Sequence, residues 1–225
     1  MERKIIVTKD GSHSVSIPQL NVTYHSIHGA IQESMHVFIE AGFRNVSVRL
    51  NRPGALRILE VGFGTGLNAF LTLIEAEKHT INVQYSAIEL YPLIEEEYKL
   101  LNYGEIVDVP SLQTVFQKLH ACEWNKEVNI VPGFSLLKVN QSLLNFTTGR
   151  CYDLVYFDAF APGAQPELWT KEVFEKVYAM MYANGVLVTY CSKGDVRRAM
   201  QSAGFIIEKI PGPPGKREMI RATRI

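Results

Sequence analysis

An aspartate at the end of an apolar run has the setting of a catalytic or a capping carboxylate. Residues 152–156 (YDLVY) have the composition of a buried strand, and Asp158 comes shortly after them. The two prolines and the glycine of residues 161–166 predict a loop. A carboxylate in this place can accept a hydrogen bond from an amine and take up charge that develops on nitrogen. It can equally cap the following turn, so both interpretations stay open on the residues alone.

A glycine-rich segment, residues 58–68 (ILEVGFGTGLN), ends one predicted strand and opens a predicted helix. Its spacing is G-x-G-x-G, whereas the dinucleotide fingerprint G-x-G-x-x-G/A would have Leu67 as its third small residue. Glu60, two residues before the first glycine, would repel a pyrophosphate. We therefore expect a ligand that has an ammonium group and no phosphate. The residues predicted to hold it are Glu60, Gly62, Phe63, Gly64, Thr65, Gly66 and Asn68.

A second acidic anchor follows the next predicted strand. Glu89 lies 23 positions after Gly66, with Leu90 beside it. A carboxylate at the end of this strand can accept hydrogen bonds from both hydroxyl groups of a ribose. The glycine loop and the two glutamates therefore predict a nucleoside-containing ligand.

These residues require a scaffold of alternating strands and helices. The patterns predict strands over 5–7, 15–17, 22–24, 57–61, 83–89, 134–139, 152–158, 186–190, 205–210 and 218–224, and helices over 29–41, 67–78, 93–101, 111–121, 170–182 and 193–203. Such alternation predicts a mostly parallel sheet, here of seven strands, with helices on both faces. The last strand should be antiparallel, because the connection 211–215 is too short for a parallel crossover.

The arrangement resembles the class I S-adenosylmethionine-dependent methyltransferases, which have a Rossmann-like fold, and the resemblance covers residues 56–225. Several segments are similar to one narrower family, the bacterial tRNA wobble-uridine methyltransferases of the MnmC type. They are residues 10–12, 33–38, 60–68, 89–93, 157–162, 166–169, 196–198 and 215–219. The resemblance implies S-adenosylmethionine as cofactor and methylation of the side-arm amine of 5-aminomethyl(2-thio)uridine to 5-methylaminomethyl(2-thio)uridine.

In the resemblance, Asp158 is the catalytic residue that orients the amine, and it also borders the cofactor. Phe160, Pro162 and Trp169 would form a stacking wall for the extruded base. Many relatives carry an acid where this chain has Asn140, which could still hydrogen-bond adenine. The family often carries a fused flavin oxidase domain, and from the end at Ile225 we expect a stand-alone form without flavin, with other enzymes making the aminomethyl group.

The charge is zero overall but unevenly distributed. Residues 75–108 contain eight acids and two bases, whereas the chain from Cys191 onward contains eight bases and three acids. An anionic partner, here the anticodon region of tRNA, would therefore meet the C-terminal part. The candidate substrate-binding residues are Glu33 on the N-terminal helix and the bases Lys193, Arg197, Arg198, Lys216 and Arg217.

Composition limits the remaining alternatives. The 225 residues are 47% hydrophobic and 20% charged, without a membrane-spanning apolar run or a signal peptide. Three scattered cysteines favour a reducing cytoplasm, and no metal site is expected. We expect an N-terminal β/helix extension over 1–50 and a methyltransferase domain over 51–225. Two alternatives stay open, namely a class I transferase acting on a small free amine and a catalytically silent tRNA-binding module.

Overall fold

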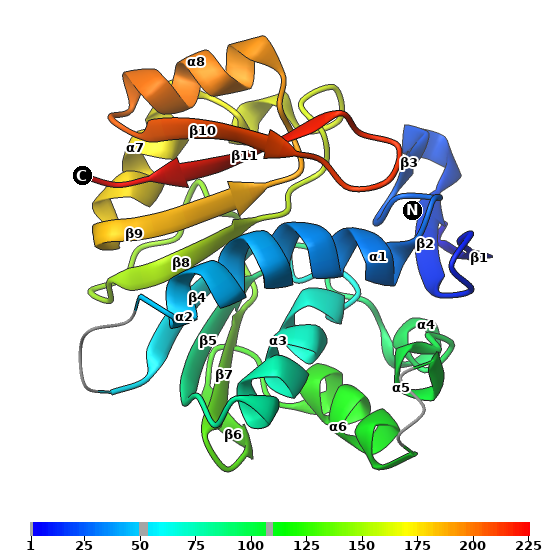
Figure 1. Cartoon of the computed structure of the whole chain (residues 1–225). Helices are drawn as coiled ribbons and strands as arrows, with labels where there is room; N and C mark the ends of the chain where they lie inside the picture. The colour runs from blue at the N-terminus through cyan, green and yellow to red at the C-terminus, as the bar shows by residue number, and fades with distance from the viewer. Residues whose placement is uncertain (1, 50–53, 107–109) are drawn as a thin grey trace.

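An eight-stranded sheet forms the centre of the structure, a computed structural model that describes residues 2–49, 54–106 and 110–225 (Figure 1). Its strands are β4 (Leu56–Val61), β5 (Val83–Ile88), β6 (Glu127–Val131), β7 (Phe134–Val139), β8 (Tyr152–Phe157), β9 (Met181–Thr189), β10 (Ile206–Pro211) and β11 (Glu218–Thr223). The order across the sheet is β10-β11-β9-β8-β4-β5-β7-β6. The central strands β7, β5, β4, β8 and β9 are parallel to one another.

The predicted antiparallel last strand is confirmed, since β11 runs antiparallel to both β9 and β10. The predicted number of seven strands is wrong for the described residues. The additional strand, β6, is an edge strand that pairs antiparallel with β7. Only Pro132 and Gly133 separate the two strands, and Gly133 has φ +82°. The short segment 127–131 is stabilised by pairing with β7, which a local pattern does not reveal.

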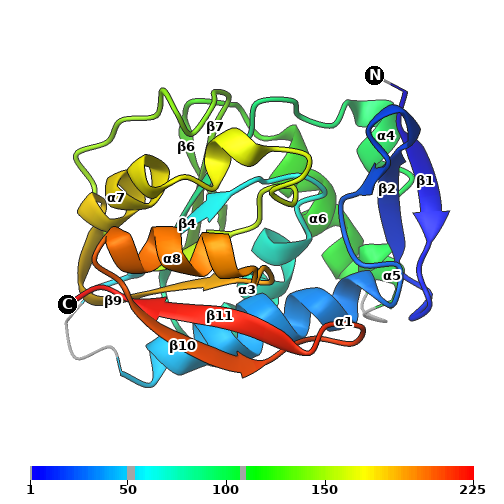
Figure 2. The same cartoon turned by 90° about the horizontal axis from the view of Figure 1, so that it is seen from above.

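Helices cover both faces of the sheet (Figures 1 and 2). One face carries α3 (Leu67–Lys78), α6 (Pro110–Ala121) and a continuous N-terminal helix made of α1 (Ala30–Ser34), the π-helix η2 (Met35–Arg44) and α2 (Asn45–Ser47). The other face carries α7 (Lys171–Ala179) and α8 (Gly194–Ser202). Alternate residues of the strands enter the two cores, as Ile58 and Leu59 do. Within the described ranges, no helix is long and apolar enough to cross a membrane.

Three predicted helices differ from the structure in their bounds, and one of them, predicted over 29–41, continues to Ser47. The helix expected over 170–182 ends at Ala179, because Met181 already pairs with Tyr152 at the start of β9. The helix expected over 93–101 is the single turn α4 (Glu95–Tyr98), followed by a second short helix, α5 (Tyr103–Ile106). In the helices predicted over 170–182 and 93–101, tertiary packing overrides the local helical pattern.

The N-terminal part adds a small antiparallel sheet of order β1-β2-β3 (Lys4–Val7, His13–Ile17 and Val22–Thr23). The helix that follows packs on the main sheet, with the rings of Phe38 and Tyr156 5.1 Å apart. This part therefore shares the core of the larger sheet. The domain boundary predicted between residues 50 and 51 lies outside the described residues.

Strand β4 lies between β5 and β8, so chain connections leave it toward both sides of the sheet. Ligands of open α/β sheets bind at such a switch point, beyond the carboxyl ends of the strands. The glycine-rich loop follows β4, Glu89 follows β5 and Asp158 follows β8. The fold therefore brings the predicted chemical groups to one edge of the sheet.

Candidate functional site

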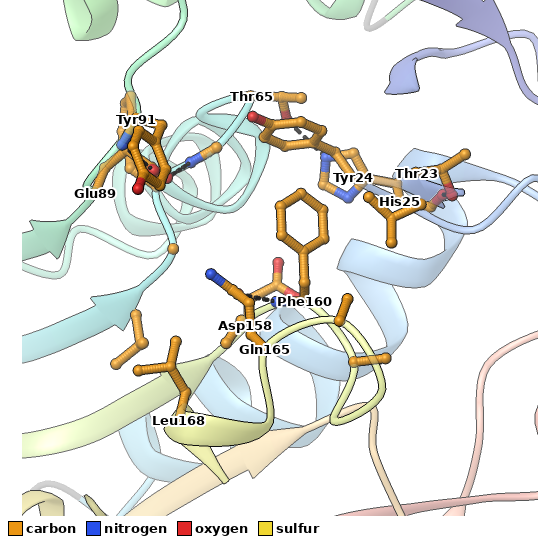
Figure 3. A pocket seen from close by; sticks show the side chains of 18 of the residues that line it. Thr23, Tyr24, His25, Thr65, Glu89, Tyr91, Asp158, Phe160, Gln165 and Leu168 are labelled. Atoms are coloured by element: carbon orange, nitrogen blue, oxygen red, sulfur yellow. Dashed lines mark hydrogen bonds between the residues drawn. The ribbon is translucent and has the colours of Figure 1, made fainter. Parts of the chain in front are cut away.

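A cavity of about 730 Å³ lies at this edge. Its walls come from the loops after β4, β5, β7 and β8 and from the N-terminal segment 20–27. Figure 3 shows Glu89 and Tyr91 on one wall, Tyr24 and His25 across from them, and Asp158 and Gln165 on the loop that follows β8. Its volume is within the range typical of small-molecule and cofactor sites.

The glycine-rich loop approaches its neighbours so closely that side chains would not fit. Gly62 has φ +90°, and a Cβ there would lie 2.7 Å from the backbone oxygen of Asp158. Gly64 has φ +48°, and its Cβ would lie 2.9 Å from the ring of Tyr24. Both positions need glycine for conformation and for space. The loop is thus a closely fitted backbone cradle that lines the cavity.

Glu89 is held rigidly beside this cradle. One carboxylate oxygen accepts a hydrogen bond from the backbone N–H of Gly64 at 3.0 Å, and the other accepts from the N–H of Tyr91 at 2.8 Å. A carboxylate oxygen has a second lone pair, so both oxygens can still accept a ligand hydroxyl group. The cradle and the acid therefore leave room and acceptors for a ribose, and the contact of Glu89 with it stays a prediction.

A single amide joins two carboxyl groups below the cavity. Asn68 donates through Nδ2 to Glu60 at 2.9 Å and to Asp158 at 2.8 Å. Its oxygen accepts from the hydroxyl of Ser34, which fixes the orientation of the amide. Asn68, Asp158 and Gly62 line the cavity, whereas Glu60 is fully buried and is not among the lining residues. Glu60 therefore lies behind the cavity wall, where it holds the lining residue Asn68, and it does not make the direct ligand contact that the sequence predicts.

Burial is the main cause of unusual protonation at this pair. It raises the pKa of Asp158 to about 7, with a further rise from the charge of Glu33, while Asn68 and Lys216 act in the opposite direction. Burial and the neighbouring Asp158 also raise the pKa of Glu60 well above its ordinary value. The second oxygen of Glu60 has no hydrogen-bond partner of standard geometry among the described residues. Both shifts favour the protonated form of the carboxyl group, and Asp158 changes charge near neutral pH.

The raised pKa of Asp158 predicts a pH-dependent stability. Between pH about 4 and about 7 the folded chain retains a proton that the unfolded chain releases, so this group destabilises the fold as pH rises through that window. Asp158→Asn removes the effect. The melting temperature of the variant minus that of the wild type should therefore increase from pH about 5 to about 8.

Burial lowers the pKa of His25 to about 4 and that of His120 to about 3. These two groups therefore make the fold more stable as the pH rises toward about 6.5, the opposite of the effect of Asp158. Both proteins share these histidines, so their effect cancels in the difference, which reports Asp158 together with the carboxyl of Glu60 that is coupled to it. The exposed carboxyl of Glu175 on α7, outside the cavity wall, supplies the control variant Glu175→Gln. A difference that stays flat with pH would contradict the raised pKa.

The N-terminal segment covers the cradle, a contribution that the sequence did not predict. The His25 ring lies 2.6 Å from the Thr65 hydroxyl of the glycine-rich loop, measured from Nε2 to Oγ1. Tyr24 contacts Phe160 edge-to-face, with ring centroids 5.0 Å apart (Figure 3). Arg3 also lines the cavity, and it donates to Glu97 and to the backbone oxygens of Tyr91 and Pro92. These contacts join segments far apart in the chain, so no local motif could predict them.

An ion pair closes the wall beside Asp158. Lys216 Nζ lies 2.5 Å from Glu33 Oε1 and 4.0 Å from the centroid of the Tyr190 ring. The other oxygen of Glu33 accepts from the backbone N–H of Ser26 at 2.7 Å. The structure thus brings the predicted residues Glu33 and Lys216 into the cavity wall together with Tyr190.

Several predicted site residues lie outside the cavity wall. Trp169 is buried against Phe157 at 5.0 Å and donates to the backbone oxygen of Phe160, so it packs in the core and does not form the predicted stacking wall. Pro162 is likewise not a lining residue. Asn140 donates to the backbone oxygens of Glu89 and Leu90, and it thereby supports the loop that carries Glu89. Phe160 lines the cavity as expected, and so does Leu90.

The basic residues divide into two groups. Arg221 pairs with Glu208, and Lys216 pairs with Glu33. The second group consists of Lys193, Arg197 and Arg198 at α8 and Arg217 in the β10–β11 loop. No hydrogen bond or ion pair within the described part of the chain holds their side chains, and none of the four lines the cavity.

The cavity holds no visible metal-ligand cluster. Among the described residues, no three histidine, cysteine, aspartate or glutamate side chains gather closely enough to hold a metal ion. The cavity wall contains a backbone cradle, an acceptor that fits a ribose, and the carboxyl group of Asp158 near the Glu33–Lys216 ion pair.

Comparisons with known proteins identify the family of the chain. The sequence model of a family described as S-adenosyl-L-methionine-dependent methyltransferase matches residues 110–225, a little over half of the chain. The crystal structure of MNMC2 from Aquifex aeolicus superposes with a TM-score of 0.77 at 25% identity, covering 98% of this chain and 70% of that one.

Two curated relatives carry the description tRNA 5-methylaminomethyl-2-thiouridine biosynthesis bifunctional protein MnmC. The one from Burkholderia pseudomallei is 27% identical over 96% of this chain and 34% of its own length. The one from Pseudomonas syringae is 29% identical over 90% of this chain and 32% of its own length. The chain therefore spans about a third of the length of the curated relatives it matches.

Proposed function

The chain belongs to the S-adenosyl-L-methionine-dependent methyltransferase family, and we propose that it methylates the side-arm amine of 5-aminomethyl(2-thio)uridine at the tRNA wobble position. The product would be 5-methylaminomethyl(2-thio)uridine. The descriptions of the MnmC relatives and of MNMC2 support the choice of substrate. The observation that carries the proposal is the position of Asp158, which lines the cavity beside the glycine-rich loop and accepts a hydrogen bond from Asn68 at 2.8 Å.

The residues of the cradle would hold the cofactor. Glu89 would accept both ribose hydroxyl groups, and the backbone of residues 62–66 would contact the remainder of the molecule. Bound there, S-adenosylmethionine supplies an electrophilic methyl group on a sulfonium. The fixed loop geometry would align this group for an in-line displacement.

Asp158 would prepare the amine for attack. An alkyl amine is largely protonated near neutral pH and is nucleophilic only as the free base. The ionised carboxylate of Asp158 accepts a hydrogen bond from the amine and directs its lone pair toward the methyl group. The nitrogen–carbon bond forms as the carbon–sulfur bond breaks, and the electron pair of that bond leaves with the thioether. The proton lost from nitrogen passes to Asp158 or to water.

The base would enter beside the aromatic residues of the wall. Phe160 and Tyr24 form an edge-to-face pair that lines the cavity, and they offer apolar surface for a pyrimidine ring. Gln165 turns its amide nitrogen toward the cavity, because its oxygen accepts from the N–H of Phe160 at 2.9 Å (Figure 3). This nitrogen can donate to a carbonyl oxygen of the base.

The anticodon region of tRNA would lie over α8. Arg197 and Arg198 lie in α8, which begins four residues after the cavity residue Tyr190, and no hydrogen bond or ion pair within the described residues holds their side chains. We predict that Arg197→Ala plus Arg198→Ala weakens tRNA binding and makes its salt dependence shallower by about 1.4 in log–log slope, at about 0.7 per contact. Affinity for S-adenosylmethionine should not change, and filter binding across salt concentrations together with calorimetry measures both.

A matched control removes two exposed bases elsewhere. Arg49 and Lys78 precede β4 and β5 and so lie near the amino-terminal edge of the sheet. Arg49→Ala plus Lys78→Ala should leave the tRNA salt slope as it is in the wild type. If instead the control variant loses affinity and the α8 variant does not, the tRNA lies on another surface.

The two alternatives predict different acceptors. A small-amine transferase would label polyamines or metabolites from S-adenosylmethionine, and a silent binding module would label nothing. We expect label in tRNA and none in spermidine when both are offered together.

The free cysteines Cys122, Cys151 and Cys191 and the tRNA substrate favour a cytoplasmic location, where partner enzymes or a separate domain would make the aminomethyl group.

A further inference from the structure

The two distant ends of the fold meet beside Asp158. Glu33 lies in α1, near the N-terminus, while Lys216 lies in the loop between β10 and β11 near the C-terminus. Figures 1 and 2 both show the tip of this β10–β11 loop beside the start of α1. The contact is tight, because a Cβ on Gly215 would lie 2.4 Å from the His28 ring. This packing holds Lys216 in the cavity wall.

The sequence presents Lys216 as a base available to tRNA, but its surroundings differ from those of Arg217. Lys216 is half-buried, is paired with Glu33, and lies over the Tyr190 ring. Arg217, its neighbour, is exposed and holds no ion pair among the described residues. The ammonium of Lys216 is therefore directed inward, toward the carboxyl groups, and Arg217 is directed outward.

Asp158 is surrounded by charged and titratable groups from each packed element. They are Glu60 on β4, Tyr85 on β5, Glu33 on α1, Tyr190 after β9 and Lys216 before β11. His25 is buried near Glu33 and Lys216, and its lowered pKa leaves it neutral. Glu33 and Lys216 line the same cavity as Asp158 and act on its pKa with opposite signs, since the Glu33 charge raises it and the Lys216 charge lowers it.

We infer that Lys216 is a positioning residue for the proposed reaction, which through its pair with Glu33 sets the charge of Asp158 and reserves that carboxylate for the substrate amine. The catalytic part of this inference rests on the proposed function. Glu33 supplies a partner that keeps the lysine ammonium off Asp158. Lys216 in turn offsets the repulsion of Glu33 on Asp158, so Asp158 ionises close to neutral pH and accepts a proton of the amine.

The test reads the titration of Asp158 directly in the whole protein. Carboxyl-labelled aspartate would be followed by carbon NMR across pH, with Asp158→Asn used to assign the signal. Lys216→Met keeps the alkyl stem over Tyr190 and removes the charge, so the Asp158 midpoint should move up by about one pH unit. Glu33→Gln keeps an acceptor for Ser26 N–H, and the midpoint should move down by a similar amount.

Two further variants separate this role from alternatives. Lys216→Met combined with Glu33→Gln should return the midpoint close to that of the wild type, because the opposing effects cancel. Arg217→Met removes one charge from the same loop and should weaken tRNA binding without moving the midpoint. In single-turnover methyl transfer, the pH–rate profile should move to higher pH in Lys216→Met and to lower pH in Glu33→Gln, as the midpoint does. Lys216→Arg should restore the wild-type profile.

Two results would overturn the inference. One is an Asp158 midpoint that is unchanged in both single variants. The other is a Lys216→Met variant that matches Arg217→Met, with altered tRNA binding and an unmoved midpoint, which would make Lys216 a phosphate contact. The NMR titration needs no substrate, so it decides the role of the ion pair even if the protein methylates something other than tRNA.

Discussion

Asp158→Asn should lower single-turnover methyl transfer to aminomethyluridine tRNA by at least about a hundredfold near pH 7. The substitution keeps the shape of the side chain and an acceptor for Asn68 Nδ2, but it removes the charge that orients and deprotonates the amine. The deficit should shrink toward pH about 10, where the amine is neutral without help. A quenched-flow series from pH about 6 to about 10 measures both effects.

The same variant separates catalysis from structure. Asparagine caps turns about as well as aspartate, so a purely structural Asp158 would tolerate the change. Binding of S-adenosylmethionine should be little affected, because Glu89 and the cradle backbone provide its main contacts in the proposal. Glu175→Gln, on α7 and outside the cavity wall, should retain the wild-type rate. A near-normal rate for Asp158→Asn at neutral pH would remove it from the mechanism.

Glu89→Ala should weaken S-adenosylmethionine binding at least about tenfold. Hydrogen bonds to a charged group contribute about 1.5–3 kcal/mol each, and two ribose hydroxyl groups would lose their acceptor. The variant also frees the N–H groups of Gly64 and Tyr91, which adds disorder to the cradle. Isothermal titration calorimetry measures the affinity, and circular dichroism confirms that the fold is kept.

A nearby carboxylate provides the control for this prediction. Glu97 pairs with Arg3 close to the same loop but does not line the cavity, so Glu97→Ala should bind S-adenosylmethionine as the wild type does. Equal affinities for wild type and Glu89→Ala would exclude the ribose contact. Tighter binding of NAD than of S-adenosylmethionine would contradict the assignment of the cradle.

The sequence predicted the scaffold because its signals are local. The alternation of apolar runs located β4, β5, β7 and β8 together with α3, and the three glycines and Glu89 followed directly from those strand ends. Strand β6 was not predicted, because the segment is short and is stabilised by pairing with β7. The predicted end of α7 was too late in the chain, because Met181 continues the helical pattern of the sequence but pairs with Tyr152 in the sheet.

The site was only partly predictable, because several of its contacts join distant segments. Asp158 was found from its place after an apolar run, but the amide that links it to Glu60 depends on the packing of α3. Tyr24 and His25 had no signal beyond β-strand composition, and they reach the cavity only because the small sheet folds over it. Trp169 stood in a chemically suggestive loop, yet an aromatic there serves the core equally well. Its direction depends on tertiary packing.

The most direct test of the proposed function is the identity of the methylated nucleoside. The protein would be incubated with labelled S-adenosylmethionine and bulk tRNA from cells lacking this enzyme, and the tRNA would then be digested and its nucleosides separated by mass. We predict that 5-aminomethyl(2-thio)uridine disappears, that 5-methylaminomethyl(2-thio)uridine carries the label, and that Asp158→Asn leaves the precursor in place. An active protein that leaves this precursor unmethylated while labelling another nucleoside or a free amine would contradict the proposed function.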